Sequence, residues 1–241
     1  MLEKDRKLLR AASRGNFEEV RRLLEQGADL HADFDRALRT AAKKGHLRMV
    51  EFLLEQGADL HAYSHDALQE AARNGHLPVV KFLVEQGDDF HAVGERAFQL
   101  AVQHGRLKVV EYLLGQGADL HIYNDYAISW SVLNCERAMV ECLLQHGADT
   151  KSITDETLKT LLKWEEDEII NILLLYNLQI EKRSPDLISS FLKKNRSRGF
   201  KCAGANKIIK TYRGKIFSEV ERLIYHLYFR PPSPAFYRAV G

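Results

Sequence analysis

The same pattern of residues recurs every thirty positions through the first 150 residues of this 241-residue chain. Two glycine series, a series of small-residue pairs and a series of leucine pairs share this period and keep their phase. One glycine series is Gly27, Gly57, Gly87, Gly117 and Gly147; the other is Gly15, Gly45, Gly75 and Gly105, ending where Cys135 replaces glycine. A thirty-residue unit cannot bury its apolar faces alone, so the repeat predicts modules stacked in a row.

Each unit is predicted to form two short helices. In the unit that begins at His31, apolar residues at helical spacing predict a first helix over 35–44 and a second over 47–56. Gly45 and Gly57 are predicted to end these helices, because glycine adopts the left-handed conformation that a helix terminus often needs. Aspartates at the start of the first helices are predicted to cap them, namely Asp35, Asp125 and Asp155.

The pattern resembles the ankyrin repeat. The matching segments are Ala-Leu-Arg-Thr-Ala-Ala at 37–42, Gly-His-Leu-Arg-Met-Val-Glu-Phe-Leu-Leu at 45–54 and Gly-Ala-Asp at 57–59. The chain departs from that family in its period, which is 30 rather than about 33, and in lacking the Thr-Pro-Leu-His element. The short period leaves a tight loop between units, so we expect the finger-like binding loops of the family to be stunted. Such shortened repeats look like those of giant-virus ankyrin proteins.

The resemblance implies an all-α, ankyrin-like helix-turn-helix solenoid with a C-terminal helical extension. We expect an array of about six units over residues 1–180, in which the first and the last are atypical. Residues 181–192 resemble the first helix of a partial seventh unit. The remainder divides into a basic segment, an amphipathic capping helix beginning near residue 216 and a Pro-rich tail.

The composition fits a packed, intracellular protein: 45% of residues are hydrophobic, 28% are charged and no apolar run is long enough to span a membrane. The first fifteen residues lack the apolar run of a signal peptide. The cysteines are odd in number and scattered, which argues against disulfides and for a reducing compartment. We expect a monomer in the cytoplasm, or in the host cytoplasm or nucleus if the chain is viral.

The sequence offers no pattern typical of an enzyme, a cofactor site or a metal site. Phosphate-binding glycine loops, zinc-protease motifs and nucleophile elbows are missing. Among ten histidines, one series follows the thirty-residue period, namely His31, His61, His91 and His121. Equivalent positions in stacked units lie too far apart to share a zinc ion, so each is interpreted as a loop residue that bonds local backbone. His46 and His76 receive the same interpretation.

We therefore expect a non-catalytic scaffold or adaptor that binds a protein partner on its concave face. Surface positions on the first helices vary between units, as binding positions of stacked modules do, although neutral drift would produce the same variation. Tyr126 and Trp130 form the predicted centre, because Tyr and Trp dominate many interfaces; the alternative is burial beneath the sixth unit. The candidate partner-binding residues are Phe34, Arg36, Arg39, Tyr63, Asp66, Arg96, Tyr123, Tyr126 and Trp130.

The second half of the chain suggests an alternative function. Residues 193–215 carry nine basic side chains and no acidic one, and such a segment could bind nucleic acid or an anionic surface. The alternatives to such binding are a cap on the open end of the stack, a second docking module and a nuclear-import tract. The basic residues are Lys193, Lys194, Arg196, Arg198, Lys201, Lys207, Lys210, Arg213 and Lys215.

Overall fold

The computed structural model describes residues 2–89, 91, 95–164, 166–176, 178 and 187. Apart from one short 3-10 turn, the regular elements of this part are α-helices, and they come in pairs. The pairs are α1 (Glu3–Arg14) with α2 (Phe17–Glu25), α3 (Ala32–Lys44) with α4 (Leu47–Glu55), α5 (Ala62–Asn74) with α6 (Leu77–Glu85), α7 (Arg96–Gln103) with α8 (Leu107–Gly115), α9 (Ile122–Leu133) with α10 (Arg137–Gln145), and α11 (Asp155–Trp164) with α12 (Asp167–Leu175). The all-α solenoid predicted from the repeat is confirmed.

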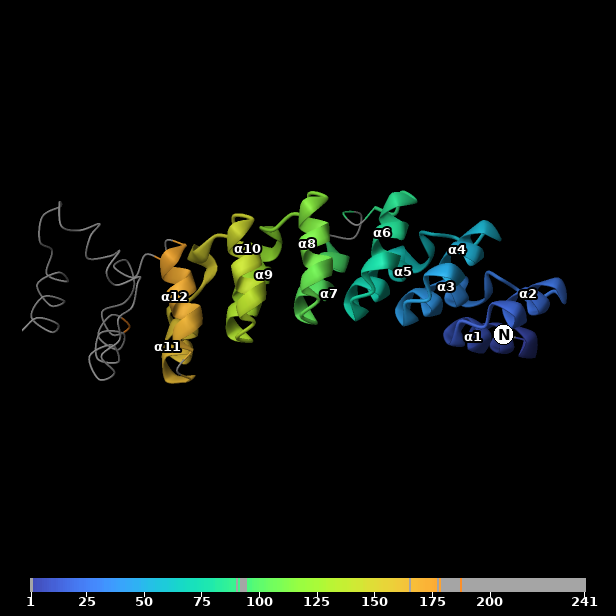
Figure 1. The fold of residues 1–241 in the computed structure, drawn as a ribbon, viewed down its shortest axis with the longest axis horizontal. Helices are drawn as coiled ribbons and strands as arrows, with labels where there is room; N and C mark the ends of the chain where they lie inside the picture. Colours follow the sequence, from blue (N-terminus) through green and yellow to red (C-terminus); the bar gives the residue numbers. More distant parts are fainter. Residues whose placement is uncertain are drawn as a thin grey trace, which may run out of the picture.

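The six pairs stack in sequence order and form an elongated molecule (Figure 1). The first helices of successive pairs contact one another along one row, and the second helices form a parallel row. The short turn Thr150–Ser152 joins α10 to α11. No strand lies among the described residues, so the loops between units are compact turns, as the short period predicts.

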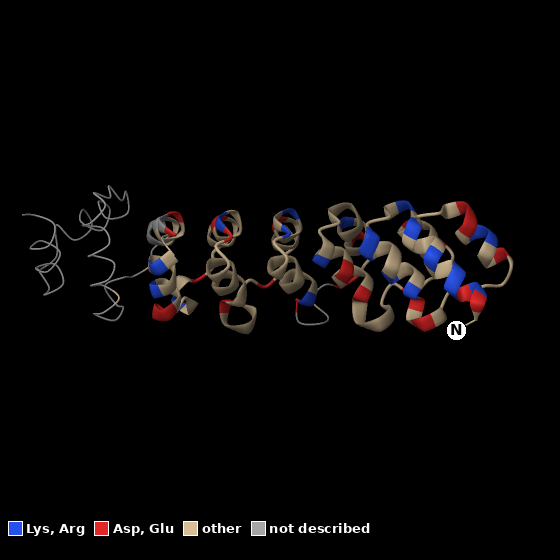
Figure 2. Cartoon of the chain, turned by 90° about the horizontal axis from the view of Figure 1, so that it is seen from below, with Lys and Arg blue, Asp and Glu red and all other residues tan. Residues whose placement is uncertain are grey.

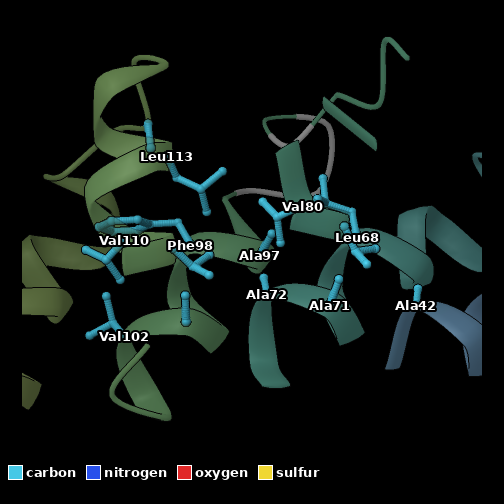
Figure 3. Close-up of a cluster of buried hydrophobic side chains, with 14 of the residues drawn as sticks. Ala42, Leu68, Ala71, Ala72, Val80, Ala97, Phe98, Val102, Val110 and Leu113 are labelled. Atoms are coloured by element: carbon cyan, nitrogen blue, oxygen red, sulfur yellow. The ribbon is translucent and has the colours of Figure 1, made fainter. Parts of the chain in front are cut away.

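The core runs continuously between the two rows because each unit covers the apolar face of its neighbour. Alanine pairs such as Ala41–Ala42 and Ala71–Ala72 are fully buried and let adjacent first helices approach closely. Leu53, Leu83, Leu113 and Leu143, one from each second helix, are also fully buried. Figure 3 shows the core of the third and fourth units; in the fourth, Phe98 lies near Val110, Val102 and Leu113.

Gly45 and Gly57 end α3 and α4 as predicted. Gly45 has φ 75° and donates its N–H to the carbonyl of Ala42, while His46 donates to Ala41. Gly57 has φ 95° and donates to Leu54. These bonds satisfy carbonyl groups that the end of a helix would otherwise leave without partners.

Cys135 occupies the left-handed position that glycine fills in the earlier units, with φ 56°. A side chain in this conformation costs about 1 kcal/mol or more. We therefore expect Cys135→Gly to raise the free energy of unfolding by about 1 kcal/mol in urea denaturation followed by circular dichroism. Cys135→Ala removes the thiol but keeps the strained geometry, so it should give no comparable gain; equal stabilisation by both variants would contradict the strain.

The predicted N-caps are wrong. A capping aspartate has extended backbone geometry, so that its carboxylate can reach the first N–H groups of its own helix. Asp35 and Asp125 instead have φ 53° and 55°, in the left-handed region, and their carboxylates accept bonds from the rings of His31 and His121. Before α11, the Thr154 hydroxyl oxygen, rather than Asp155, accepts the N–H of Thr157 at 3.2 Å.

The array ends in the described part with the helix pair α11 and α12. Of the expected seventh unit, only Leu187 is described, and it is buried. The basic segment 193–215, the capping helix and the Pro-rich tail lie outside the described residues. In the part that is described, no helix is both long and apolar enough to cross a lipid bilayer.

Candidate partner-binding surface

A left-handed turn precedes the regular part of the first helix in several units. Residues 33–35, 63–65 and 123–125 all have φ between 50° and 62°, and Glu95 shares this geometry at 58°. Non-glycine residues rarely adopt this conformation, and runs of three are rarer still. The turns therefore need support from bonds to the surrounding chain.

Buried carboxylates supply this support. Asp5, Asp35 and Glu95 occupy the same position of their units, are almost fully buried and each accept a backbone N–H from a residue 24 positions later. For Asp35 the donor is the N–H of Asp59, at 3.2 Å. Each of these carboxylates joins a first helix to the loop that leads into the next unit.

The periodic histidines complete the same network. The backbone N–H groups of His31, His61, His91 and His121 each donate to an aspartate two residues earlier, at 2.8–2.9 Å. The His31 ring bonds Asp35 at 3.0 Å, the His91 ring bonds Glu95, and the His121 ring bonds Asp125 at 2.5 Å. Their predicted role as local loop residues is right, but the rings bond carboxylates rather than backbone.

A second set of side chains bonds the backbone of the preceding unit. The rings of His46 and His76 bond the carbonyls of Ser13 and Lys43, at 3.1 and 2.9 Å. At the equivalent position of the next unit, Arg106 donates to the carbonyl of Arg73 at 2.9 Å. These bonds lie between residues 33 positions apart, so they hold neighbouring units together.

The third unit departs from the network. His65 stands where other units have Asp or Glu, and Asp88 stands where the other units have Ala or, in the sixth, Leu. The His65 ring bonds the Asp88 carboxylate at 2.5 Å, and the His61 ring lies 3.3 Å from that of His65. Burial raises the pKa of Asp88 above its usual value, and the bond from His65 opposes that shift. Sequence reasoning missed this cluster, although both substitutions break the repeat.

Four of the candidate partner-binding residues meet on the described surface. Phe34 and Tyr63 are 65% and 62% exposed, and their ring centroids lie 6.0 Å apart. The Arg39 guanidinium lies 4.7 Å from the centre of the Tyr63 ring and pairs with Asp66 at 2.8 Å. Arg39 also donates to the backbone carbonyls of Asp33 and Phe34. A single arginine thus fixes both the turn that carries Phe34 and the ring of Tyr63.

The fifth unit presents its aromatic residues differently. Tyr126 and Trp130 stack with centroids 5.7 Å apart, and both are partly buried. The hydroxyl of Tyr126 accepts the side-chain amide of Gln103 in the preceding unit. Tyr123 and Leu133 are 65% and 43% exposed, so they form the accessible part of this region.

The two remaining candidates make local contacts. Arg36 pairs with Asp33 at 2.8 Å, and Arg96 donates to Gln99 at 3.4 Å. Charged residues gather over the N-terminal units (Figure 2), whereas α9 contains Asp125 as its one charged residue. The face is therefore mixed in charge near Phe34 and Tyr63 and largely uncharged near Tyr123.

The cysteines of the described part do not form a reactive pair. Cys142 is buried, and burial raises the pKa of its thiol to about 11. Burial also raises the pKa of Cys135. The thiolate is the reactive form of cysteine, so both residues should react slowly with iodoacetamide at pH 8 in the native protein and rapidly once it is unfolded. Fast labelling of native Cys142 would contradict this assignment.

Comparison with known families agrees with the architecture. A family model described as "Ankyrin repeats (3 copies)" matches residues 5–64 and again residues 61–124. Over these residues the chain belongs to the ankyrin repeat family. Ankyrin repeats are generally protein–protein interaction modules and non-enzymatic scaffolds. A search of curated proteins gave no significant match.

Proposed function

We propose that this chain is a non-catalytic scaffold or adaptor, and that it binds a protein partner on the concave face formed by its first helices and the turns before them. The observation that supports this proposal most directly is the exposure of Phe34, Tyr63 and Tyr123, each more than 60% accessible, on turns at equivalent places in three units. Exposed aromatic residues on one face are typical of interaction sites.

The turns are held by hydrogen bonds to buried groups, which favours tight binding. A side chain that is already held in place loses little conformational entropy when a partner binds. The left-handed turns of Phe34 and Tyr63 are tied to buried groups, and Arg39 bonds across both units. Phe34, Arg39, Tyr63 and Asp66 form one binding centre in this proposal.

The second centre is the uncharged region of the fifth unit. Tyr126 and Trp130 serve mainly as its support, since they stack on each other and are partly buried. Tyr123 and Leu133 provide the accessible contact surface there. Arg36 and Arg96 contribute charge at the edges of the face.

Substitution of the exposed aromatics tests the proposal. A partner is first captured with the wild-type chain, identified and purified, and its affinity is then measured by calorimetry. Phe34→Ala, Tyr63→Ala and Tyr123→Ala together should weaken binding at least about tenfold, because interface aromatics contribute much of the binding energy. The helical circular dichroism spectrum should not change, since these rings are exposed.

The matched control replaces exposed glutamates at the ends of two second helices, Glu25→Ala with Glu55→Ala. This variant should bind as the wild type does. If the control loses affinity while the triple variant keeps it, the partner binds the second helices instead, and the proposed face is wrong.

The basic segment 193–215 supports a second candidate function, binding to nucleic acid or another anionic surface. Nine basic residues with no acidic neighbour favour such contacts. The expected result is salt-dependent retention on heparin that is lost when the chain is truncated after residue 192. Retention by the truncated chain would assign the binding to the repeats.

The family suggests the remaining properties that we propose. Ankyrin repeat proteins are usually intracellular, and we propose a cytoplasmic, monomeric protein without catalytic activity. Sedimentation of the full chain should give a mass near 27.6 kDa; twice that mass would show a dimer.

A further inference from the structure

In the third unit, two residues depart from the repeat together. At the position of His65, the other units carry Asp5, Asp35, Glu95 and Asp125. At the position of Asp88, the first, second, fourth and fifth units carry Ala28, Ala58, Ala118 and Ala148, and the sixth carries Leu178. The carboxylate lost from the start of the first helix is therefore replaced by one in the following loop, and the unit gains a second imidazole.

The exchange brings three metal-ligating groups together. The Nδ1 atoms of His61 and His65 are 3.3 Å apart, and the Oδ1 atom of Asp88 lies 2.5 Å from His65 Nδ1 and 3.7 Å from His61 Nδ1. Among the described residues, His61, His65 and Asp88 form a group whose ligand atoms are close enough to bind one ion.

These distances suit the size of a zinc ion. The circle through the three ligand atoms has a radius of about 1.9 Å, from the three separations. Zinc–nitrogen and zinc–oxygen bonds are about 2.0–2.2 Å. An ion at that distance from all three atoms lies roughly 1 Å out of their plane. The tetrahedral angle that zinc prefers needs His65 Nδ1 and Asp88 Oδ1 to move apart from 2.5 Å to about 3.4 Å, which rotation of the two side chains can provide.

Burial and charge favour a cation at the same place. The Asp88 side chain is fully buried, and its Oδ2 atom has no hydrogen-bond partner among the described residues. A buried carboxylate with a free oxygen is costly unless positive charge lies beside it. The His61 side chain is 54% exposed, so solvent reaches this side of the cluster and a water molecule can occupy a fourth coordination position.

We propose that His61, His65 and Asp88 bind one zinc ion, or a divalent transition metal of similar preference. Both imidazoles bind through Nδ1, each with its own proton on Nε2, and Asp88 binds through its carboxylate. The ion takes the place of the proton that lies between His65 and Asp88: in a neutral His65 this proton moves to Nε2, and in an imidazolium, which already carries a proton there, it is released to solvent. Imidazole with a single carboxylate suits zinc better than calcium or magnesium, which prefer oxygen ligands alone.

A metal ion at this site would link the turn that carries Tyr63 to the loop that leads to α7. His61 and His65 lie at the two ends of the turn that carries Tyr63, and Asp88 lies in the loop that leads to α7. A bound ion therefore holds this turn against the loop. The other units offer only pairs of ligands at this place, such as His31 with Asp35 and His121 with Asp125, and they serve as internal comparisons.

Zinc titration of the full chain tests the proposal. The metal is delivered as zinc sulfate at pH 7.5 in competition with a chromogenic chelator, and the thermal midpoint is recorded in parallel. The variant His65→Asp with Asp88→Ala restores the residues of the second and fifth units, so it should fold normally. We expect the wild type to bind zinc at least about 100-fold more tightly than this double variant, since the variant has only a histidine–aspartate pair, as in the second and fifth units, in place of three ligands.

The thermal midpoint of the wild type should rise by about 5–10 °C when free zinc exceeds its Kd 100-fold. His31→Ala removes the equivalent histidine of the second unit and should leave zinc affinity unchanged, and calcium or magnesium should have no effect on the wild type. Three results would overturn the proposal: no zinc binding by the wild type below 1 mM, equal affinity in the double variant, or a loss in His31→Ala as large as in the double variant.

Discussion

Replacing Phe98 by alanine is expected to lower the free energy of unfolding by about 3–5 kcal/mol. Phe98 is the largest fully buried side chain of the described core and lies beside Val102 and Val110 of its own unit (Figure 3). Truncation to alanine leaves a cavity in a region where neighbouring helices are already in contact, so the surrounding chain can close it only in part. Urea denaturation followed by circular dichroism measures the change.

Phe98→Leu provides the matched control. Leucine occupies the equivalent position in the first three units as Leu8, Leu38 and Leu68, all buried. A leucine at residue 98 should therefore be accommodated and should cost less than about 1.5 kcal/mol. A cost for Phe98→Ala below that for Phe98→Leu would show that residue 98 is not packed in the core.

The second large effect is expected for Gly45→Ala. Both Gly45 and Gly57 have positive φ, so alanine at either position costs about 1–2 kcal/mol of backbone strain. A Cβ atom on Gly45 would also lie 2.5 Å from Nδ1 of His76, whereas a Cβ atom on Gly57 would meet nothing within 4 Å. We expect Gly45→Ala to cost roughly 2–4 kcal/mol and Gly57→Ala about 1–2 kcal/mol.

A double-mutant cycle separates the clash from the strain. His76 also bonds the carbonyl of Lys43 at 2.9 Å, so displacement of its ring should weaken a contact between units. In a His76→Ala background, Gly45→Ala should cost no more than Gly57→Ala does in the wild type. Equal costs for the two glycines in the wild type would rule out the predicted contact between Gly45 and His76.

The helix pairs could be predicted from the sequence because each is specified locally. Apolar spacing, the alanine pairs and the glycines at 45 and 57 all indicate the same two-helix unit, and the structure confirms it. The left-handed turns could not be predicted in this way. Residues 33–35 are Asp-Phe-Asp; aspartate enters the left-handed region more often than most residues, but as a single residue and not in a run of three. The bond from the N–H of Asp59 to Asp35, 24 positions away in the chain, supports the turn.

Of the candidate surface, too, one part could be predicted from the sequence and another part could not. Exposed aromatics in the turns were identifiable from composition and register, and Phe34 and Tyr63 lie side by side. The partial burial of Tyr126 and Trp130 depends on packing between units, which a list of residues does not specify. The cluster of His61, His65 and Asp88 could have been found by asking which substitutions break the repeat at two positions together.

The linear stack of thirty-residue modules is tested most directly by distances between equivalent residues of successive units. Gln26, Gln56, Gln86 and Gln116 are exposed and each follows a second helix, so spin labels can be placed there in a cysteine-free background. Pulsed electron paramagnetic resonance should give separations that grow with each unit, by roughly 10 Å per step. Separations that do not increase in order from Gln26 to Gln116 would contradict a linear stack of thirty-residue modules.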